Sequence, residues 1–209
     1  MGSNVTPTYS DASARKGILE KHLSEIATGF NPNMFMTIDF FKPKGFPDLD
    51  KLYQRRSGDI KNFQHGIMNR LDRFVYGRNH FRIEDSEKYP YISRVEHFNK
   101  SGIKVPAHIH ILARLPEDHL KRILQRDPET WEECLTEEGW KLTGRFDSYA
   151  RRLQFDPDID VRLFQLGSGN IGYIFKVPRE EDLSIQFRLS HSMDDPVASN
   201  VPPGDLILQ

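Results

Sequence analysis

Two runs of strand-forming residues, 89–98 and 105–114, flank the short polar segment Asn99-Lys100-Ser101-Gly102. Turn-forming residues that include a glycine, placed between two such runs, are typical of a β-hairpin. The side chains of each hairpin strand alternate between two faces, and residues that lie opposite each other share a face. This hairpin constrains the fold more than any other segment, because it predicts which polar side chains gather on one face.

The residues before the hairpin predict one strand and one long helix. Residues 34–41 are rich in β-formers, and Pro43 and Gly45 end the run. Asp48 offers an N-cap for a helix, and Gly58 is a candidate point of division within it. The apolar residues of this helix recur at spacings of three and four, which predicts one buried face: Ile60, Phe63, Ile67, Leu71 and Phe74. Its outer face carries basic residues: Arg55, Arg56, Lys61, Arg70 and Arg73.

The residues after the hairpin predict shorter elements. Pro116 opens a helix that turns Leu120, Ile123 and Leu124 inward. A short helix is expected over 131–135, a strand over 160–166, and a helix over 171–177 that ends before Pro178. This order predicts an α+β domain with a mainly antiparallel sheet and helices on one face. The other face would then be free to bind a ligand.

The chain of 209 residues has the size of a single domain. We expect an N-terminal extension over 1–30 that is partly disordered, a folded domain over 31–190 and a flexible tail over 191–209. No run of about 18 apolar residues occurs, so no membrane span is expected. The single cysteine, Cys134, fits a reducing compartment, and we expect a cytoplasmic protein.

The net charge of -1 conceals an uneven distribution of charge. Residues 41–114 contain 15 basic and 8 acidic residues, a net charge of +7, whereas residues 115–209 contain 11 basic and 18 acidic residues, a net charge of -7. A basic segment attracts a polyanion, and an acidic segment limits non-specific binding. The charge therefore argues against a protein that coats nucleic acid, and it is compatible with one that contacts nucleic acid locally.

The sequence His108-Ile109-His110 in the second hairpin strand is a candidate metal-binding motif. Residues two apart in a strand project to the same side, so two imidazoles lie close together and can chelate a divalent ion. Hairpin pairing sets Glu96 nearly opposite His108 or His110 on the same face. His97 is a rival third ligand, although alternation turns it to the other face. Glu96, His108 and His110 together predict a mixed nitrogen and oxygen site for Mg²⁺ or Mn²⁺.

A tyrosine and a lysine one helical turn apart, Tyr173 and Lys176, form the next candidate group. A phenol is a weak nucleophile at neutral pH, and a nearby cation favours its phenolate form. Tyr149, which precedes Arg151 and Arg152, is a rival nucleophile. Without a further signal, an amphipathic tyrosine at the edge of the core explains Tyr173 equally well.

The first strand, the His-hydrophobe-His strand and the downstream Tyr173-x-x-Lys176 follow one another in an order that resembles the HUH endonuclease superfamily. The set is most similar to single-tyrosine rolling-circle replication initiators of plasmids and phages. The resemblance covers about residues 33–178, and the histidines and the Tyr-x-x-Lys are its specific parts.

This resemblance implies an RRM-like (palm-like) sheet with the histidines on its central strand. It implies a divalent metal held by His108, His110 and Glu96, and a nucleophile, Tyr173, assisted by Lys176. Such an enzyme nicks single-stranded DNA or an origin hairpin, leaves a 5′-phosphotyrosine link and a free 3′-hydroxyl, and thereby starts rolling-circle replication. A host helicase is a candidate further partner, because the chain has no P-loop motif. The expected DNA contacts are basic residues of the +7 segment: Arg55, Arg56, Lys61, Arg94 and Lys104.

Other functions stay open on the sequence alone. A relaxase-type or transposase-type HUH enzyme would use the same residues on another substrate. A metal-dependent phosphodiesterase would use the histidine pair with water as the nucleophile. A nucleic-acid-binding domain without activity would carry the histidines incidentally.

Overall fold

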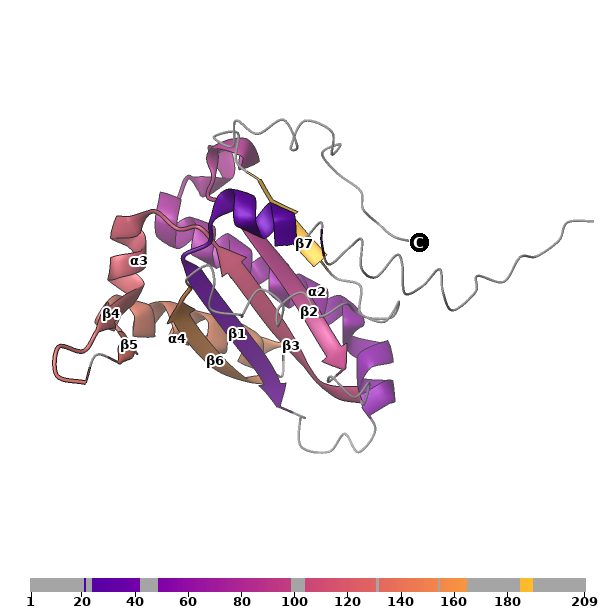
Figure 1. Cartoon of the computed structure of the whole chain (residues 1–209). Helices are drawn as coiled ribbons and strands as arrows, with labels where there is room; N and C mark the ends of the chain where they lie inside the picture. Colours follow the sequence, from indigo (N-terminus) through magenta and orange to yellow (C-terminus); the bar gives the residue numbers. More distant parts are fainter. Residues whose placement is uncertain are drawn as a thin grey trace, which may run out of the picture.

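The computed structural model describes residues 21, 24–41, 49–98, 104–130, 132–153, 155–164 and 185–189. They form an α+β fold around a five-stranded antiparallel sheet with the strand order β6-β1-β3-β2-β7. The strands are β1 (Met34–Phe41), β2 (Tyr91–Phe98), β3 (Lys104–Ala113), β6 (Asp156–Leu163) and β7 (Ile185–Arg188) (Figure 1). The predicted α+β class and antiparallel sheet are thus confirmed.

The hairpin forms as predicted and lies in the middle of the sheet. In β2 and β3, Glu96 pairs with His108 and Arg94 pairs with His110. The register shifts after Glu96, between Glu96 and Phe98, which marks a β-bulge or irregularity at this end of the hairpin. Strand β1 pairs with the other side of β3, so β3 is the central strand of the sheet.

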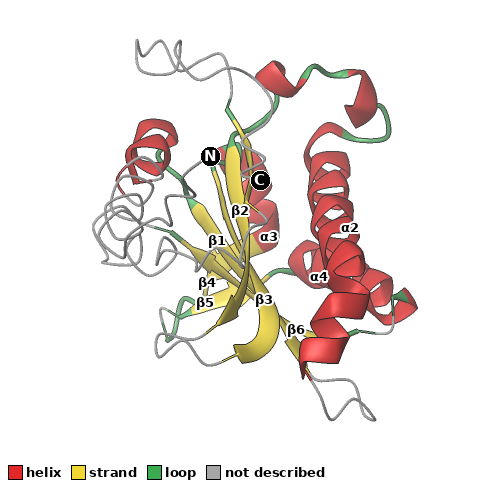
Figure 2. Ribbon diagram, turned by 90° about the vertical axis from the view of Figure 1, so that its right-hand side faces the viewer, coloured by secondary structure: helices red, strands yellow, loops and turns green. Residues whose placement is uncertain are grey.

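One face of the sheet is covered by two helices, α2 (Leu49–Tyr76) and α4 (Glu137–Arg152), which lie on the same side of the strands (Figure 2). We call this side the helix face. Its main core joins the predicted apolar stripe of α2 to alternate residues of the strands: Ile60, Phe63, Ile67, Leu71, Met36, Ile38, Ile109 and Ile111. Helix α2 is continuous through Gly58, so the expected division there is wrong.

The opposite face, which we call the metal face, is not free along its whole length. Residues 24–30 form a helix, and its Ala27 and Phe30 pack against Ile92, Leu112 and Phe164 at one end of this face. The expectation that helices cover only one face is therefore corrected. The reason is physical: Ile92 and Leu112 are apolar residues on the metal face, and burying them stabilises the fold.

The segment between β3 and β6 differs most from expectation. Helix α3 (Glu117–Ile123) follows Pro116 as predicted and buries Leu120 and Ile123. The short helix expected over 131–135 is wrong, because β4 (Leu124–Arg126) and β5 (Glu133–Leu135) pair there as a two-stranded sheet. Helix α4 was not expected; the side chain of Thr136 caps its start by accepting a hydrogen bond from the amide of Gly139. Strand β6 begins at Asp156 and ends at Leu163, whereas the expected strand covered 160–166.

The helix expected over 171–177 and the tail over 191–209 lie outside the described residues. In the parts of the chain that the structure describes, no helix combines the length and the apolar character that a membrane crossing needs.

Candidate metal centre

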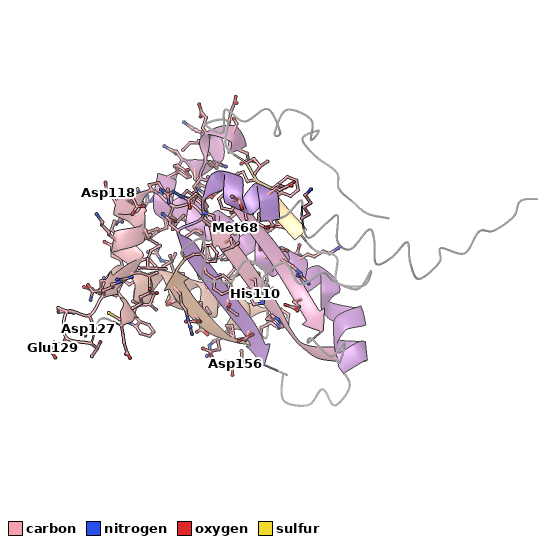
Figure 3. All side chains as sticks on the ribbon, viewed as in Figure 1. Met68, His110, Asp118, Asp127, Glu129 and Asp156 are labelled. Atoms are coloured by element: carbon pink, nitrogen blue, oxygen red, sulfur yellow. The ribbon has the colours of Figure 1, made fainter. Side chains whose placement is uncertain are left out.

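Three side chains on the metal face bring their ligand atoms together in the middle of the sheet. One carboxylate oxygen of Glu96, Oε2, lies 3.1 Å from Nε2 of His108 and 3.4 Å from Nε2 of His110. The ligand atoms of the three residues all lie within 4.8 Å of one another, so that the group could hold a metal ion. We call Glu96, His108 and His110 the metal-ligand group. Figure 3 shows His110 over the middle of the sheet, well away from Asp118, Asp127 and Glu129 at the α3 and β4–β5 side.

Backbone pairing explains this convergence. His108 and His110 alternate with Ile109 and Ile111, which are fully buried in the helix-face core, so both imidazoles project to the metal face. Glu96 sits opposite His108 in the adjacent strand, where paired residues share a face. The sequence left two registers open, and the structure selects the one that pairs Glu96 with His108.

Strand β1 supplies two side chains that sequence reasoning did not single out. The Oγ1 atom of Thr37 lies 3.2 Å from Nδ1 of His110, and the ring of Phe35 stacks on the His110 ring with a centroid distance of 5.6 Å. A hydrogen bond at Nδ1 directs the other ring nitrogen, Nε2, toward Glu96. No signal in the sequence identified these neighbours, because the pairing of β1 with β3 joins residues about 70 positions apart.

The group is poised to attract a cation. Burial alone would raise the pKa of Glu96, but hydrogen bonds from His108 and His110, with the charge of Arg94, lower it well below its usual range, so the carboxylate is ionised. Burial lowers the pKa of His110, although Glu96 acts in the opposite direction. The lowered pKa favours the neutral imidazole, which is the form that binds a metal. In the strand register, the exposed Asp39 lies opposite His108 on one side and opposite Asp158 on the other. The carboxylates of Asp39 and Asp158 add negative potential on the same face.

The donor set fits a divalent ion. Two imidazole nitrogens and one carboxylate oxygen are borderline ligands that suit a transition metal such as Mn²⁺, and three protein ligands leave coordination positions for a substrate oxygen. The side chains of Glu96 and His110 are buried, and that of His108 is 18% exposed. The group is thus enclosed on the sheet side and reachable from the side of His108.

The remaining predicted site residues lie elsewhere. Tyr149, on α4, belongs to the helix face, where its ring stacks on Phe63 and its hydroxyl donates to the carbonyl of Asn62. It therefore does not share a face with the metal-ligand group. Arg94 is only 2% exposed, and its charge helps to lower the pKa of Glu96, two residues away in the same strand.

The other expected DNA contacts and the expected nucleophile are only partly described. Lys61 is exposed on α2. The backbones of Arg55 and Arg56 lie in α2 and that of Lys104 begins β3. Tyr173 and Lys176 lie outside the described residues.

Comparisons with protein-family models, with curated proteins and with solved structures give no match for this chain.

Proposed function

We propose that this protein is a metal-dependent endonuclease of the HUH type that nicks single-stranded DNA and stays covalently linked to it. The observation that carries the proposal is the contact of one Glu96 carboxylate oxygen with both histidines of the His108-Ile109-His110 motif. In this proposal the nicking reaction starts rolling-circle replication of a plasmid or phage, with single-stranded DNA or an origin hairpin as substrate.

The topology supports this proposal. The strand order β6-β1-β3-β2 is that of a βαββαβ domain with two crossover helices, α2 and α4, on one face; α3, β4 and β5 are inserted between β3 and α4. This order supports the RRM-like arrangement that the HUH resemblance implies. The histidines lie on β3, the central strand, as that arrangement requires.

The proposed cofactor is Mn²⁺ or Mg²⁺, held by Glu96, His108 and His110. A bound ion would supply Lewis-acid polarisation of a phosphate oxygen. Imidazole ligands favour Mn²⁺ over Mg²⁺, because Mg²⁺ prefers oxygen ligands throughout. We therefore expect tighter binding of Mn²⁺.

The proposed nucleophile is Tyr173. The tyrosines whose side chains the structure describes, Tyr76, Tyr89, Tyr91 and Tyr149, all pack with the helix-face core, so none of these four is proposed as the nucleophile.

The proposed chemistry follows from these residues. The Tyr173 hydroxyl oxygen attacks the scissile phosphorus and forms a phosphotyrosine bond, while the bond from phosphorus to the 3′ oxygen breaks. The phenol proton passes to solvent, and the departing oxygen takes up a proton to become a free 3′-hydroxyl. Lys176 lowers the cost of the phenolate and steadies the phosphate.

The test is the formation of an adduct that survives SDS. We expect the protein to form one with single-stranded DNA that carries its origin sequence, in the presence of Mn²⁺. Tyr173→Phe should abolish the adduct, Tyr149→Phe should leave it unchanged, and Glu96→Gln should reduce it strongly.

Other outcomes overturn parts of the proposal. An adduct that persists in Tyr173→Phe and is lost in Tyr149→Phe would mean that Tyr149, and not Tyr173, is the nucleophile. Cleavage without any adduct would indicate a phosphodiesterase that uses water. Binding of DNA without cleavage or metal uptake would indicate a nucleic-acid-binding domain without activity.

A further inference from the structure

A second candidate site lies on the helix face, where neither the metal-ligand group nor the proposed nucleophile is involved. A pocket of about 750 Å³ opens between the C-terminal half of α2 and α4. Among the residues that the structure describes, its lining contains five arginines and no carboxylate: Arg70, Arg73, Arg78, Arg145 and Arg152. We call it the arginine pocket.

The charges of the arginine pocket are not neutralised by the acidic side chains that the structure describes. Outside the pocket, Arg82 and Arg126 also have no acidic partner among the described residues. Five other arginines outside it have one: Arg114, Arg122, Arg151, Arg162 and Arg188. None of those ion pairs includes an arginine of the pocket. Arg151 and Arg152 are neighbours in α4, and only Arg151, outside the lining, reaches Asp147 and Asp156.

Stabilisation of helix ends explains only part of this cluster. Cations near the last turn of a helix interact favourably with the helix dipole. Arg73 and Arg152 lie in last turns. Arg70 and Arg145 lie inside their helices, and Arg78 follows the end of α2. The helix dipole therefore does not explain why Arg70, Arg78 and Arg145 lie in the same pocket without carboxylates beside them.

The pocket is partly organised in advance. The Arg70 guanidinium donates a hydrogen bond of 2.7 Å from Nη1 to the carbonyl of Gly66, and it lies 3.8 Å from the centroid of the Tyr149 ring. Arg152 donates from Nε to the carbonyl of Ser148 at 3.3 Å. Guanidinium groups held in this way lose less conformational freedom when they bind a ligand.

We propose that the arginine pocket binds the phosphodiester backbone of duplex DNA. Guanidinium groups match the geometry of phosphate oxygens with paired hydrogen bonds, and five of them exceed what one phosphate needs. Among the described residues of the lining, His80 is the one with an aromatic ring, and there is no Phe, Tyr or Trp on which successive unpaired bases could stack, which favours a duplex over a single strand. The site goes beyond the proposed nuclease function, because it needs neither the metal nor Tyr173.

The test is salt-dependent binding of a labelled 16-base-pair duplex to the full chain, in EDTA, with two unrelated sequences. Each phosphate contact contributes about 0.9 to the slope of log K against log salt. The double variant Arg73→Ala/Arg145→Ala should therefore make this negative slope shallower by about 1.8. It should also weaken binding by about tenfold at 0.1 M salt, for both sequences. Ser148→Glu, which adds a carboxylate to the lining, should weaken binding without removing any arginine.

The matched control removes two charges elsewhere. Lys121→Ala/Arg126→Ala replaces exposed residues outside the lining and should keep the wild-type slope. An equal loss in that control, an unchanged slope in the pocket variant, or unchanged binding by folded Ser148→Glu would overturn the proposal. A loss of duplex binding in His108→Ala/His110→Ala as large as that of the pocket variant would place the duplex on the metal face and overturn it as well. Preferential binding of inorganic tripolyphosphate that displaces the duplex at equal phosphate concentration would identify a small polyphosphate as the ligand instead.

Discussion

The Oγ1 atom of Thr37 lies 3.2 Å from Nδ1 of His110, across the pairing of β1 with β3. A histidine that binds a metal through one ring nitrogen commonly carries its proton on the other nitrogen and donates it to a neighbour. Thr37 stands where that neighbour is needed, and it therefore orients the His110 ring so that Nε2 faces Glu96.

The first prediction is that Thr37→Val weakens metal binding. The change keeps the shape of the side chain and removes its hydrogen-bonding oxygen, so His110 loses the contact that sets its orientation. Loss of such an outer contact typically costs 10- to 100-fold in metal affinity, and we expect a Kd for Mn²⁺ about tenfold higher by titration calorimetry. Thr37→Ser retains the oxygen and should bind nearly as well as wild type.

A control addresses general loss of stability. Thr143 is buried, and its hydroxyl donates to the carbonyl of Gly139 on the far side of the sheet. Thr143→Val should leave the Mn²⁺ affinity unchanged. If Thr37→Val binds Mn²⁺ as tightly as wild type, Thr37 has no part in positioning His110.

The second prediction concerns stabilisation by the metal. An ion that binds only the folded state at 100 times its Kd adds about 2.7 kcal/mol to the free energy of unfolding. Mn²⁺ should therefore raise the Tm of the wild type, and EDTA should reverse the rise. Glu96→Gln keeps the size of the side chain but removes the charge that both histidines contact, and its Tm should not respond to Mn²⁺. An equal rise in the variant would place the ion elsewhere.

The part of the site that could be predicted from the sequence is the part that one hairpin contains. Glu96, His108 and His110 lie within 15 residues of one another, and turn chemistry with strand alternation is enough to bring them to one face. Strand β1 was predicted with its observed ends, but its pairing with β3 depends on packing between distant segments. Thr37 and Phe35 therefore could not be placed beside His110.

Two further differences have physical causes. The buried positions of α4 are Gly139, Leu142, Thr143, Phe146 and Ala150, and three of these are small or polar, so the apolar period that marks a helix is weak. Arg94 was expected to contact DNA because it is a basic residue of the +7 segment. It is buried on the same face and strand as Glu96, and its charge stabilises the ionised form of that carboxylate.

A buried ion cluster ties the edge strand β7 to α2. The Arg188 guanidinium donates two hydrogen bonds of 2.8 Å to the carboxylate of Asp72, and Lys88 Nζ lies 3.6 Å from the same carboxylate. Arg188 also donates from Nε to the carbonyl of Tyr89. Burial alone would raise the pKa of Asp72, but the hydrogen bonds and charge of Arg188 lower it overall.

The third prediction is a loss of stability in acid through Asp72. A carboxyl group whose pKa is lower in the folded state stabilises the fold above its unfolded pKa of about 3.9, and this contribution is lost as the pH falls through the folded pKa. At pH 6, Asp72→Asn should lower the free energy of unfolding by about 3 kcal/mol, because it leaves the buried Arg188 and Lys88 with only the exposed Asp85 as an acidic partner. The difference from wild type should shrink below about pH 4, as measured by urea unfolding. Glu129→Gln, at an exposed position, should follow the wild type at each pH, and a difference for Asp72→Asn that does not change with pH would contradict the assignment.

The fourth prediction tests the close contact of α2 with α4. A Cβ atom at Gly66 would overlap the ring of Tyr149, which is held by stacking on Phe63 and by Arg70. Gly66→Ala should therefore destabilise the protein by about 1–3 kcal/mol through overpacking, although alanine favours a helix. Gly144 provides the matched control, because it lies inside α4 with open space where a Cβ would be. Gly144→Ala should stabilise the protein by about 0.5–1 kcal/mol. Chemical unfolding of the two variants and the wild type measures both changes. A Gly66→Ala protein as stable as Gly144→Ala would mean that the two helices do not meet through the Tyr149 ring.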